Sequence, residues 1–181
     1  LAMTNTWFIS NSAPSKAGGA MVNLTATVQG GGFVANRAWG LAGGLEALGW
    51  LAVTDTVFLS NSAGLGGGLY QASGQGRVVN SLFAGNSARL GGAAVASLGP
   101  LTLLFNTITS GTLGAGSAIV LGDDMAGVTD TIIAGYAMGI SQSAGSAYQD
   151  DNLFAGVPDD ERELILGGNM VRVYNLQGVL D

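Results

Sequence analysis

Apolar and polar positions along the chain recur in a block that appears four times. Each block has a phenylalanine, an asparagine three residues later, an alanine two residues further on, and then a pair of glycines. The phenylalanines stand at positions 8, 33, 58 and 83, so the step is 25 residues throughout. A fixed period of this size is typical of a solenoid, whose units bury their apolar faces only by stacking on one another. The four blocks are Phe8, Asn11, Ala13 and Gly18-Gly19; Phe33, Asn36, Ala38 and Gly43-Gly44; Phe58, Asn61, Ala63 and Gly67-Gly68; and Phe83, Asn86, Ala88 and Gly91-Gly92.

Short strands account for the apolar residues within each block. Alternating pairs such as Leu51 and Val53, or Leu101 and Leu103, have the period-2 pattern of a strand with one buried face. A second apolar run follows each glycine pair, and a third strand contains the phenylalanine. The glycines suit the corners between strands, because glycine tolerates positive φ and close backbone approach. We therefore predict an all-β fold, a right-handed parallel β-helix of about six coils, with three strands and three corners in each coil of about 25 residues.

A polar pair, Asn or Asp followed by Thr or Ser, recurs upstream of the phenylalanine position. A side chain of this kind can satisfy bent backbone at a corner and contact its equivalents in neighbouring coils. We expect a structural ladder here, with Gly30 filling the vacant slot in the second coil. The pairs are Asn5-Thr6, Asp55-Thr56, Asn80-Ser81, Asn106-Thr107 and Asp130-Thr131, at steps of 50, 25, 26 and 24 residues.

The repeat weakens after residue 101 and changes character at Pro158. Ile108 and Ile133 stand where phenylalanine is expected, and the segment 151–156 echoes 80–85, which predicts a last coil there. We assign 1–157 to the β-helix. Residues 158–181 begin with proline and acids, continue with good helix formers and contain Gly167-Gly168, so we predict a short helical C-terminal segment that caps the solenoid or docks on a neighbour.

The motif Phe-x-x-Asn followed by Gly-Gly-[Ala/Gly/Leu] resembles the repeat of chlamydial polymorphic outer membrane proteins and of related β-helix surface proteins in other bacteria. The resemblance covers about residues 1–100 with good motifs and 101–155 with decayed ones. It implies a secreted, autotransporter passenger-like protein that acts outside the cell or at the cell surface as an adhesin or structural scaffold. Leu1 already stands in mid-repeat, so we expect a piece of a longer protein.

Composition narrows the range of partners and of chemistry. The net charge is −6, with Lys16 as the single lysine and five scattered arginines, so no basic stripe is present to follow a phosphate backbone and nucleic acid is not an expected partner. Cysteine and histidine are both absent, which removes disulfides, thiolate metal sites and the commonest general base. The uncharged stretch between Arg89 and Asp123 is broken by glycines and Pro100, so we predict no transmembrane helix. No cofactor is expected.

Acidic residues are the only candidates for catalysis or metal binding. Asp123, Asp124, Asp150 and Asp151 form two pairs on loops that leave successive coils. They are candidates for a calcium site, for the paired carboxylates of a polysaccharide lyase or glycoside hydrolase, or for simple solvated turn residues. We assign no catalytic, cofactor-binding or metal residue, and we interpret Asp55 and Asp130 as structural.

Threonine ranks and aromatic residues leave a third hypothesis open. Regular Thr-x-Thr pairs on a flat face would suit an ice-binding or surface-binding solenoid, although β-branched residues also simply favour strands. Trp7, Trp39, Trp50 and Tyr70 are candidates for stacking on sugars, but we interpret most of them as core or corner residues. The hypothesis we favour is a non-enzymatic extracellular or cell-surface scaffold or adhesin. Its expected partner is a surface or extracellular protein or glycan, or another copy joined end to end. The threonine pairs are Thr4 and Thr6, Thr54 and Thr56, Thr107 and Thr109, and Thr129 and Thr131.

Overall fold

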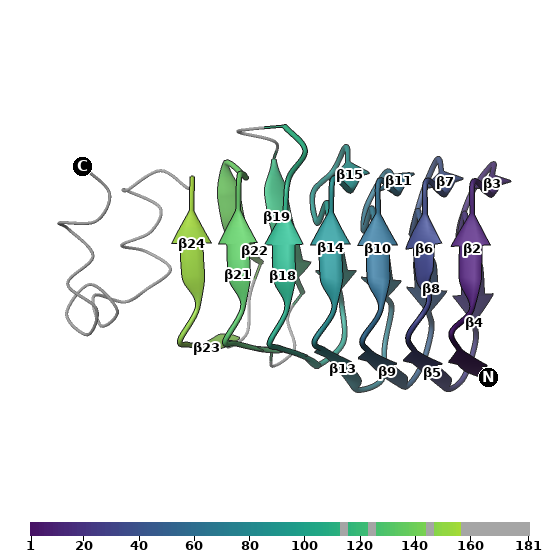
Figure 1. The fold of residues 1–181 in the computed structure, drawn as a ribbon, viewed down its shortest axis with the longest axis horizontal. Helices are drawn as coiled ribbons and strands as arrows, with labels where there is room; N and C mark the ends of the chain where they lie inside the picture. The colour runs from purple at the N-terminus through teal and green to yellow at the C-terminus, as the bar shows by residue number, and fades with distance from the viewer. Residues whose placement is uncertain (113–115, 123–125, 144–146, 157–181) are drawn as a thin grey trace, which may run out of the picture.

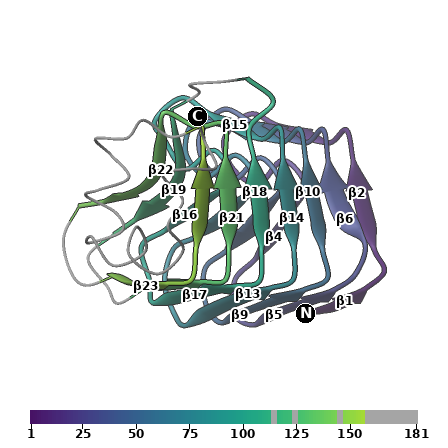
Figure 2. The same ribbon diagram turned by 60° about the vertical axis from the view of Figure 1, so that its left-hand side comes forward.

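The chain winds into a parallel β-solenoid in which every strand pairs with its equivalent in the next coil (Figure 1). The computed structural model describes residues 1–112, 116–122, 126–143 and 147–156. These form six coils and the beginning of a seventh, and the sheets lie along different sides of the solenoid (Figure 2). All the regular structure in the described ranges is strand. The predicted helical cap at 158–181 lies outside the described residues.

Three long sheets and one short sheet make up the fold. Sheet 1 contains β1 (Ala2–Thr4), β5 (Ala26–Gln29), β9 (Leu51–Thr54), β13 (Gly76–Val79), β17 (Leu101–Leu104), β20 (Ala126–Thr129) and β23 (Ala147–Asp150). Sheet 2 contains β2 (Trp7–Ile9), β6 (Gly32–Val34), β10 (Val57–Leu59), β14 (Leu82–Ala84), β18 (Thr107–Thr109), β21 (Ile132–Ala134) and β24 (Leu153–Ala155). Sheet 3 contains β4 (Ala20–Val22), β8 (Leu45–Ala47), β12 (Leu69–Gln71), β16 (Val95–Ser97), β19 (Ser117–Leu121) and β22 (Met138–Gln142).

The short sheet adds a fourth strand to each of the first four coils, where the sequence predicts only three. It contains β3 (Ser12–Ala13), β7 (Arg37–Ala38), β11 (Ser62–Ala63) and β15 (Ser87–Ala88), which follow the repeated asparagines. Each of these strands is only two residues long, too short for an alternating pattern to reveal it.

A column of aromatic rings runs through the interior, as the 25-residue spacing predicts. Phe8, Phe33, Phe58 and Phe83 stack with centroid separations of 5.0, 5.0 and 4.5 Å and interplanar angles of 9° or less. The column continues through Ile108, Ile133 and Phe154, which occupy the same register in β18, β21 and β24. The last coil predicted from 151–156 is therefore confirmed. These side chains and those of sheets 1 and 3 form one continuous core.

The repeated asparagines form a buried ladder beside the phenylalanines. The Asn61 side-chain amide donates to Asn86 Oδ1 at 3.0 Å and to the Phe33 carbonyl at 2.7 Å. Its own Oδ1 accepts bonds from the backbone and side-chain N–H groups of Asn36, both at 3.0 Å. Asn36 and Asn61 are fully buried, so water cannot reach the backbone groups that have no strand partner at this corner. The side-chain amides supply the hydrogen bonds that these groups need.

The Asn/Asp-Thr pairs form a corner, with one correction to the sequence alignment. In four of the five pairs the first residue has positive φ, as at Asp55 (54°) and Asp130 (49°), a conformation that Asn, Asp and Gly adopt most easily. In the fifth coil this slot is held by Phe105 (φ 57°), and Asn106 occupies the next, interior slot. Asn106 Oδ1 accepts the Ser81 backbone N–H at 2.9 Å. The predicted steps of 26 and 24 residues were therefore wrong, and the spacing stays at 25.

The glycine pairs permit close packing rather than supplying positive φ in the first three coils. A Cβ added to Gly68 would lie 2.6 Å from the Ala94 carbonyl oxygen and 3.0 Å from Phe83 Cδ1. In the fourth coil the aligned residues are Ala93 and Ala94, because Leu69 pairs with Val95, and Gly91 and Gly92 precede that position with positive φ. The assignment of Gly91-Gly92 as the equivalent pair was therefore wrong.

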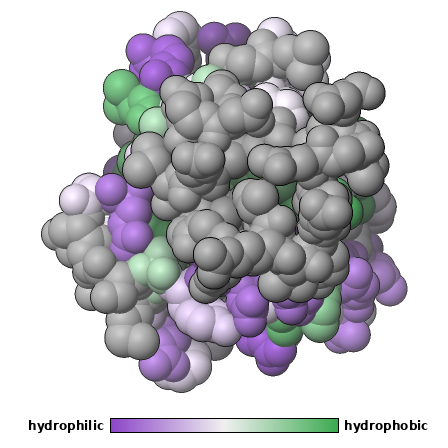
Figure 3. Space-filling view, turned by 90° about the vertical axis from the view of Figure 1, so that its left-hand side faces the viewer, coloured by the Kyte–Doolittle hydropathy of each residue, from purple (hydrophilic) through white to green (hydrophobic). Residues whose placement is uncertain are grey.

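The described part of the chain has no helix long and apolar enough to cross a membrane. Viewed from the end at which β24 lies, hydrophilic and hydrophobic side chains both appear around the rim (Figure 3).

Candidate functional site

Of the four acidic candidates, Asp150 and Asp151 lie within the described residues. Asp150 lies on β23, where its Oδ2 accepts a hydrogen bond of 2.7 Å from the Tyr148 hydroxyl, and Asp151 occupies the corner slot with φ 48°. Asp123 and Asp124 lie outside the described residues. Within the described ranges no group of three or more His, Cys, Asp or Glu side chains is placed to hold a metal ion. The calcium and paired-carboxylate hypotheses thus gain no support from the described acids.

The threonine ranks do not share one face. Thr56 and Thr131 are fully buried, and their hydroxyls donate to the carbonyls of Thr54 and Thr129. Thr107 and Thr109 lie on β18 in sheet 2, whereas Thr54 ends β9 in sheet 1. A flat hydroxyl surface built from these pairs is therefore not what the chain forms.

The four aromatic candidates differ in position and exposure. Trp7, Trp39 and Trp50 are 54%, 60% and 60% exposed, whereas Tyr70 is buried. The interpretation of most of them as core or corner residues agrees with buried Tyr70 and with Trp39 and Trp50, which lie between strands, but not with Trp7, which is exposed on β2. The Arg37 guanidinium lies 5.0 Å from the centroid of the Trp39 ring.

Sheet 2 presents a flat outer surface, which we call the sheet 2 face. Two columns of outward residues run along all seven strands, and none of these residues is charged. Six of them are exposed large hydrophobics. The exposed hydrophobics are Trp7, Ile9, Leu59, Leu82, Ile132 and Leu153.

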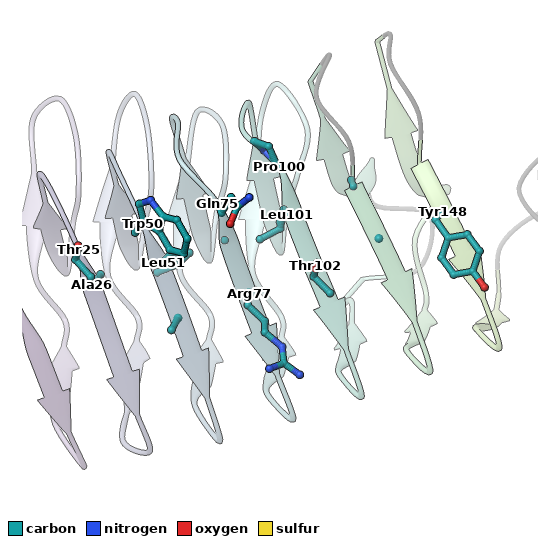
Figure 4. Close-up of a pocket in the computed structure, with 14 residues that line it drawn as sticks. Thr25, Ala26, Trp50, Leu51, Gln75, Arg77, Pro100, Leu101, Thr102 and Tyr148 are labelled. Atoms are coloured by element: carbon teal, nitrogen blue, oxygen red, sulfur yellow. The ribbon is translucent and has the colours of Figure 1, made fainter.

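Sheet 1 carries a groove on its outer side, which we call the sheet 1 groove. The close-up shows Trp50 and Tyr148 toward its two ends, with Arg77 and Thr102 between them (Figure 4). Its volume is about 630 Å³, within the range of ordinary ligand sites. Thr25, Gln75 and Pro100 line one side, at the corner that precedes sheet 1. Among the described residues of the lining, Arg77 is the only charged one. The groove thus combines two exposed aromatic rings, hydroxyl and amide groups, and one cation.

A buried carboxylate lies on the outer side of sheet 3, at a position that alternation would assign to solvent. Glu46 on β8 is fully buried and pairs in register with Tyr70 of the next coil, which belongs to a small apolar cluster with Ala42 and Ala96. Within the described residues, neither carboxylate oxygen has a hydrogen-bond partner. Lys16 Nζ lies 3.8 Å from Oε1, and its side chain is about half exposed. Burial raises the pKa of Glu46, and the Lys16 charge opposes this shift.

The free energy of unfolding is expected to fall as pH rises through the unfolded-state pKa of Glu46, whose ordinary value is 4.5. The unfolded carboxyl ionises freely there, while the folded one ionises only at its raised pKa, so the folded state binds more protons in between and loses stability as they dissociate. The stabilising contribution is complete below the unfolded pKa and is lost by the folded pKa. Glu46→Gln should flatten this dependence and raise the Tm at pH 7, and Lys16→Met should steepen it. Thermal melts across this range check both, and a Glu46→Gln curve parallel to that of the unmodified protein would contradict the assignment.

Comparisons of the chain with protein-family models, with curated protein sequences and with solved structures give no match.

Proposed function

We propose that the chain is a rigid, non-enzymatic module that acts outside the cell or at its surface as a structural scaffold and adhesin. The observation that carries this proposal is the stack of coils, which holds the sheet 2 face in a fixed position over seven strands and the sheet 1 groove over six. At about 4.8 Å per strand, the face extends roughly 30 Å and the groove roughly 24 Å along the axis. A long, rigid and uncharged apolar surface is a feature of interaction sites.

The recurring polar side chains support a structural role for the repeats, because these side chains form hydrogen bonds between neighbouring coils. Asn36, Asn61 and Asn86 bond one another and the phenylalanine carbonyls, and Thr56, Ser81 and Asn106 form a second internal row. Of these residues, Asn36, Asn61 and Asn86 belong to the motif that resembles polymorphic outer membrane protein repeats. We propose kinship with those surface proteins on the motif and on the β-solenoid together, with export and surface location as its consequences.

The test is attachment of beads that carry the full chain of residues 1–181 to coated surfaces under flow. The coatings are mucin, fibronectin, polygalacturonate and an uncharged galactan. Beads with the folded chain should be retained on at least one coating, and beads with the heat-unfolded chain should not, since adhesion depends on faces that only the solenoid forms. Equal retention of both preparations, or no retention on any coating, would overturn the proposal.

Enzymatic function is tested separately with a panel of plant, algal and bacterial polysaccharides, with and without calcium. The expected result is no product. Turnover that disappears on replacing Asp123, Asp124, Asp150 or Asp151 by Asn would replace the scaffold proposal with a polysaccharide lyase or hydrolase.

A further inference from the structure

One column of outward residues forms the floor of the sheet 1 groove, and three of its five side chains are small. Ala52, Arg77, Thr102, Gly127 and Tyr148 occupy equivalent outward positions in consecutive strands. Within the described part of the chain, a Cβ added to Gly127 would meet no atom within 4 Å. No described residue therefore fills the space above the floor at this glycine.

Two exposed aromatic rings mark the ends of the groove. Trp50 and Tyr148 are 60% and 64% exposed. Tyr148 lies four strands beyond Ala52 in the same column, a separation of about 19 Å at the usual spacing of parallel strands. The hydrogen bond from its hydroxyl to Asp150 Oδ2 limits the rotation of the ring. Two solvent-exposed rings at this distance suit an elongated ligand that has polar edges and apolar faces and that contacts each ring with a different face.

Among the described lining residues the single charged side chain is a cation, Arg77, and the nearest described carboxylate, that of Asp150, is engaged by the Tyr148 hydroxyl. Arg77 is exposed, and within the described residues its guanidinium has no ion pair or hydrogen bond. A guanidinium binds planar carboxylates and sulfates through paired N–H donors. Thr25, Gln75 and Thr102 add hydroxyl and amide groups that can exchange hydrogen bonds with a polyhydroxylated ligand.

From these features we propose that the sheet 1 groove binds a strand of acidic polysaccharide. Sugar rings lie with their C–H faces on Trp50 and Tyr148, and a carboxylate or sulfate on an intervening sugar pairs with Arg77. The inference rests on the proposed adhesive function, and it gives that function a ligand class and a place.

Other occupants fit the groove less well. A peptide strand would need free backbone donors and acceptors, but the inner strands of sheet 1 direct theirs to the neighbouring coils. A nucleic acid would bring many phosphates to a single cation on an acidic protein. A small free acid would leave the two distant rings without a contact.

The binding experiment follows the indole N–H signals of Trp7, Trp39 and Trp50 by nuclear magnetic resonance. The probe is tetragalacturonate, with uncharged galactotetraose and a sulfated carrageenan tetrasaccharide as comparison ligands. Only the Trp50 signal, assigned with Trp50→Phe, should move, while Trp7 and Trp39 report any binding elsewhere. The tetrasaccharide with the stronger effect identifies the acid group, and galactotetraose should bind about tenfold more weakly, the factor expected when one charge-assisted pair is lost.

Two groove variants and two matched controls test the roles of charge and space. Arg77→Gln removes the cation, and Gly127→Phe fills the open floor; each should weaken tetragalacturonate binding by about tenfold or more. Arg37→Gln removes an arginine on the short sheet, and Ala84→Phe adds a ring to the sheet 2 face; both should bind as the unmodified chain does. Circular dichroism confirms that each variant is folded.

The outcomes separate this inference from the proposed function. No movement of the Trp50 signal with any acidic tetrasaccharide, unchanged affinity in Arg77→Gln and Gly127→Phe, or equal binding of hexaglutamate would overturn the polysaccharide groove. If folded-chain beads still attach to a coating after such a result, the adhesive function stands on another surface, such as the sheet 2 face. If the beads fail on every coating while Trp50 responds as expected, the groove stands and the adhesive function fails.

Discussion

Phe58→Ala is expected to lower the free energy of unfolding by about 3–5 kcal/mol, the usual cost of removing a large buried aromatic side chain. Phe58 is fully buried and stacks on Phe33 at 5.0 Å and on Phe83 at 4.5 Å, so the change leaves a cavity and removes two ring contacts. The surrounding strands are held in register by both neighbouring coils and cannot collapse freely into the space. Urea denaturation followed by circular dichroism measures the loss.

Leu59→Ala is the matched control for this change. Leu59 follows Phe58 on β10, points outward and is 39% exposed, so its truncation removes apolar area without opening an internal cavity. A loss below about 1 kcal/mol is expected there. Equal losses at the two positions would mean that the stacked rings do not form the core of the solenoid.

Asn61→Ala is expected to cost a similar amount, about 3–5 kcal/mol, for a different reason. The change leaves the Asn36 backbone N–H without its acceptor and the Phe33 carbonyl without the amide donor, both beside the core. It also removes one donor to Asn86 Oδ1. Each buried polar group left unsatisfied costs about 1–3 kcal/mol. Amide hydrogen exchange should show the loss as faster exchange at Asn36, and urea denaturation gives its total.

Asn11→Ala is the matched control. It tests whether the loss of stability depends on burial within the ladder or follows from removing any asparagine. Asn11 is the terminal member of the same ladder and is exposed to solvent, and within the described residues its side chain bonds only to Asn36 Oδ1, so water can replace what that side chain supplies. We expect a change below about 1 kcal/mol. A small effect at Asn61 as well would show that water already reaches the ladder.

The interior was predictable from sequence because its residues repeat. Stacking places equivalent residues in contact, so Phe58 must resemble Phe33 and Phe83, and the same constraint selects an amide at Asn61. The error at Asn106 has a physical origin as well: two adjacent slots accept similar polar residues, and Phe105 adopts the positive φ that Asn or Asp would otherwise supply. Local residue types alone could not distinguish the two registers.

The outer surfaces were not predictable because nothing in the stack forces them to repeat. Trp50, Arg77 and Tyr148 have no counterparts at 25-residue intervals, and they form a groove only because the register aligns their strands. The burial of Glu46 was also not predicted from the sequence. Glu46 stands at an outward position, and its burial depends on tertiary packing.

The constant offset between coils has a consequence for the gene. From β1 to β20, neighbouring strands of sheet 1 are aligned at a difference of 25 residues, so a segment of 25 codons encodes one interchangeable layer. An in-frame duplication of such a segment supplies a new coil whose phenylalanine and asparagine meet ready partners above and below. Each duplication or deletion would change the reach of the molecule by about 4.8 Å. Unequal recombination can therefore adjust the length of this protein one layer at a time, with its interior unchanged.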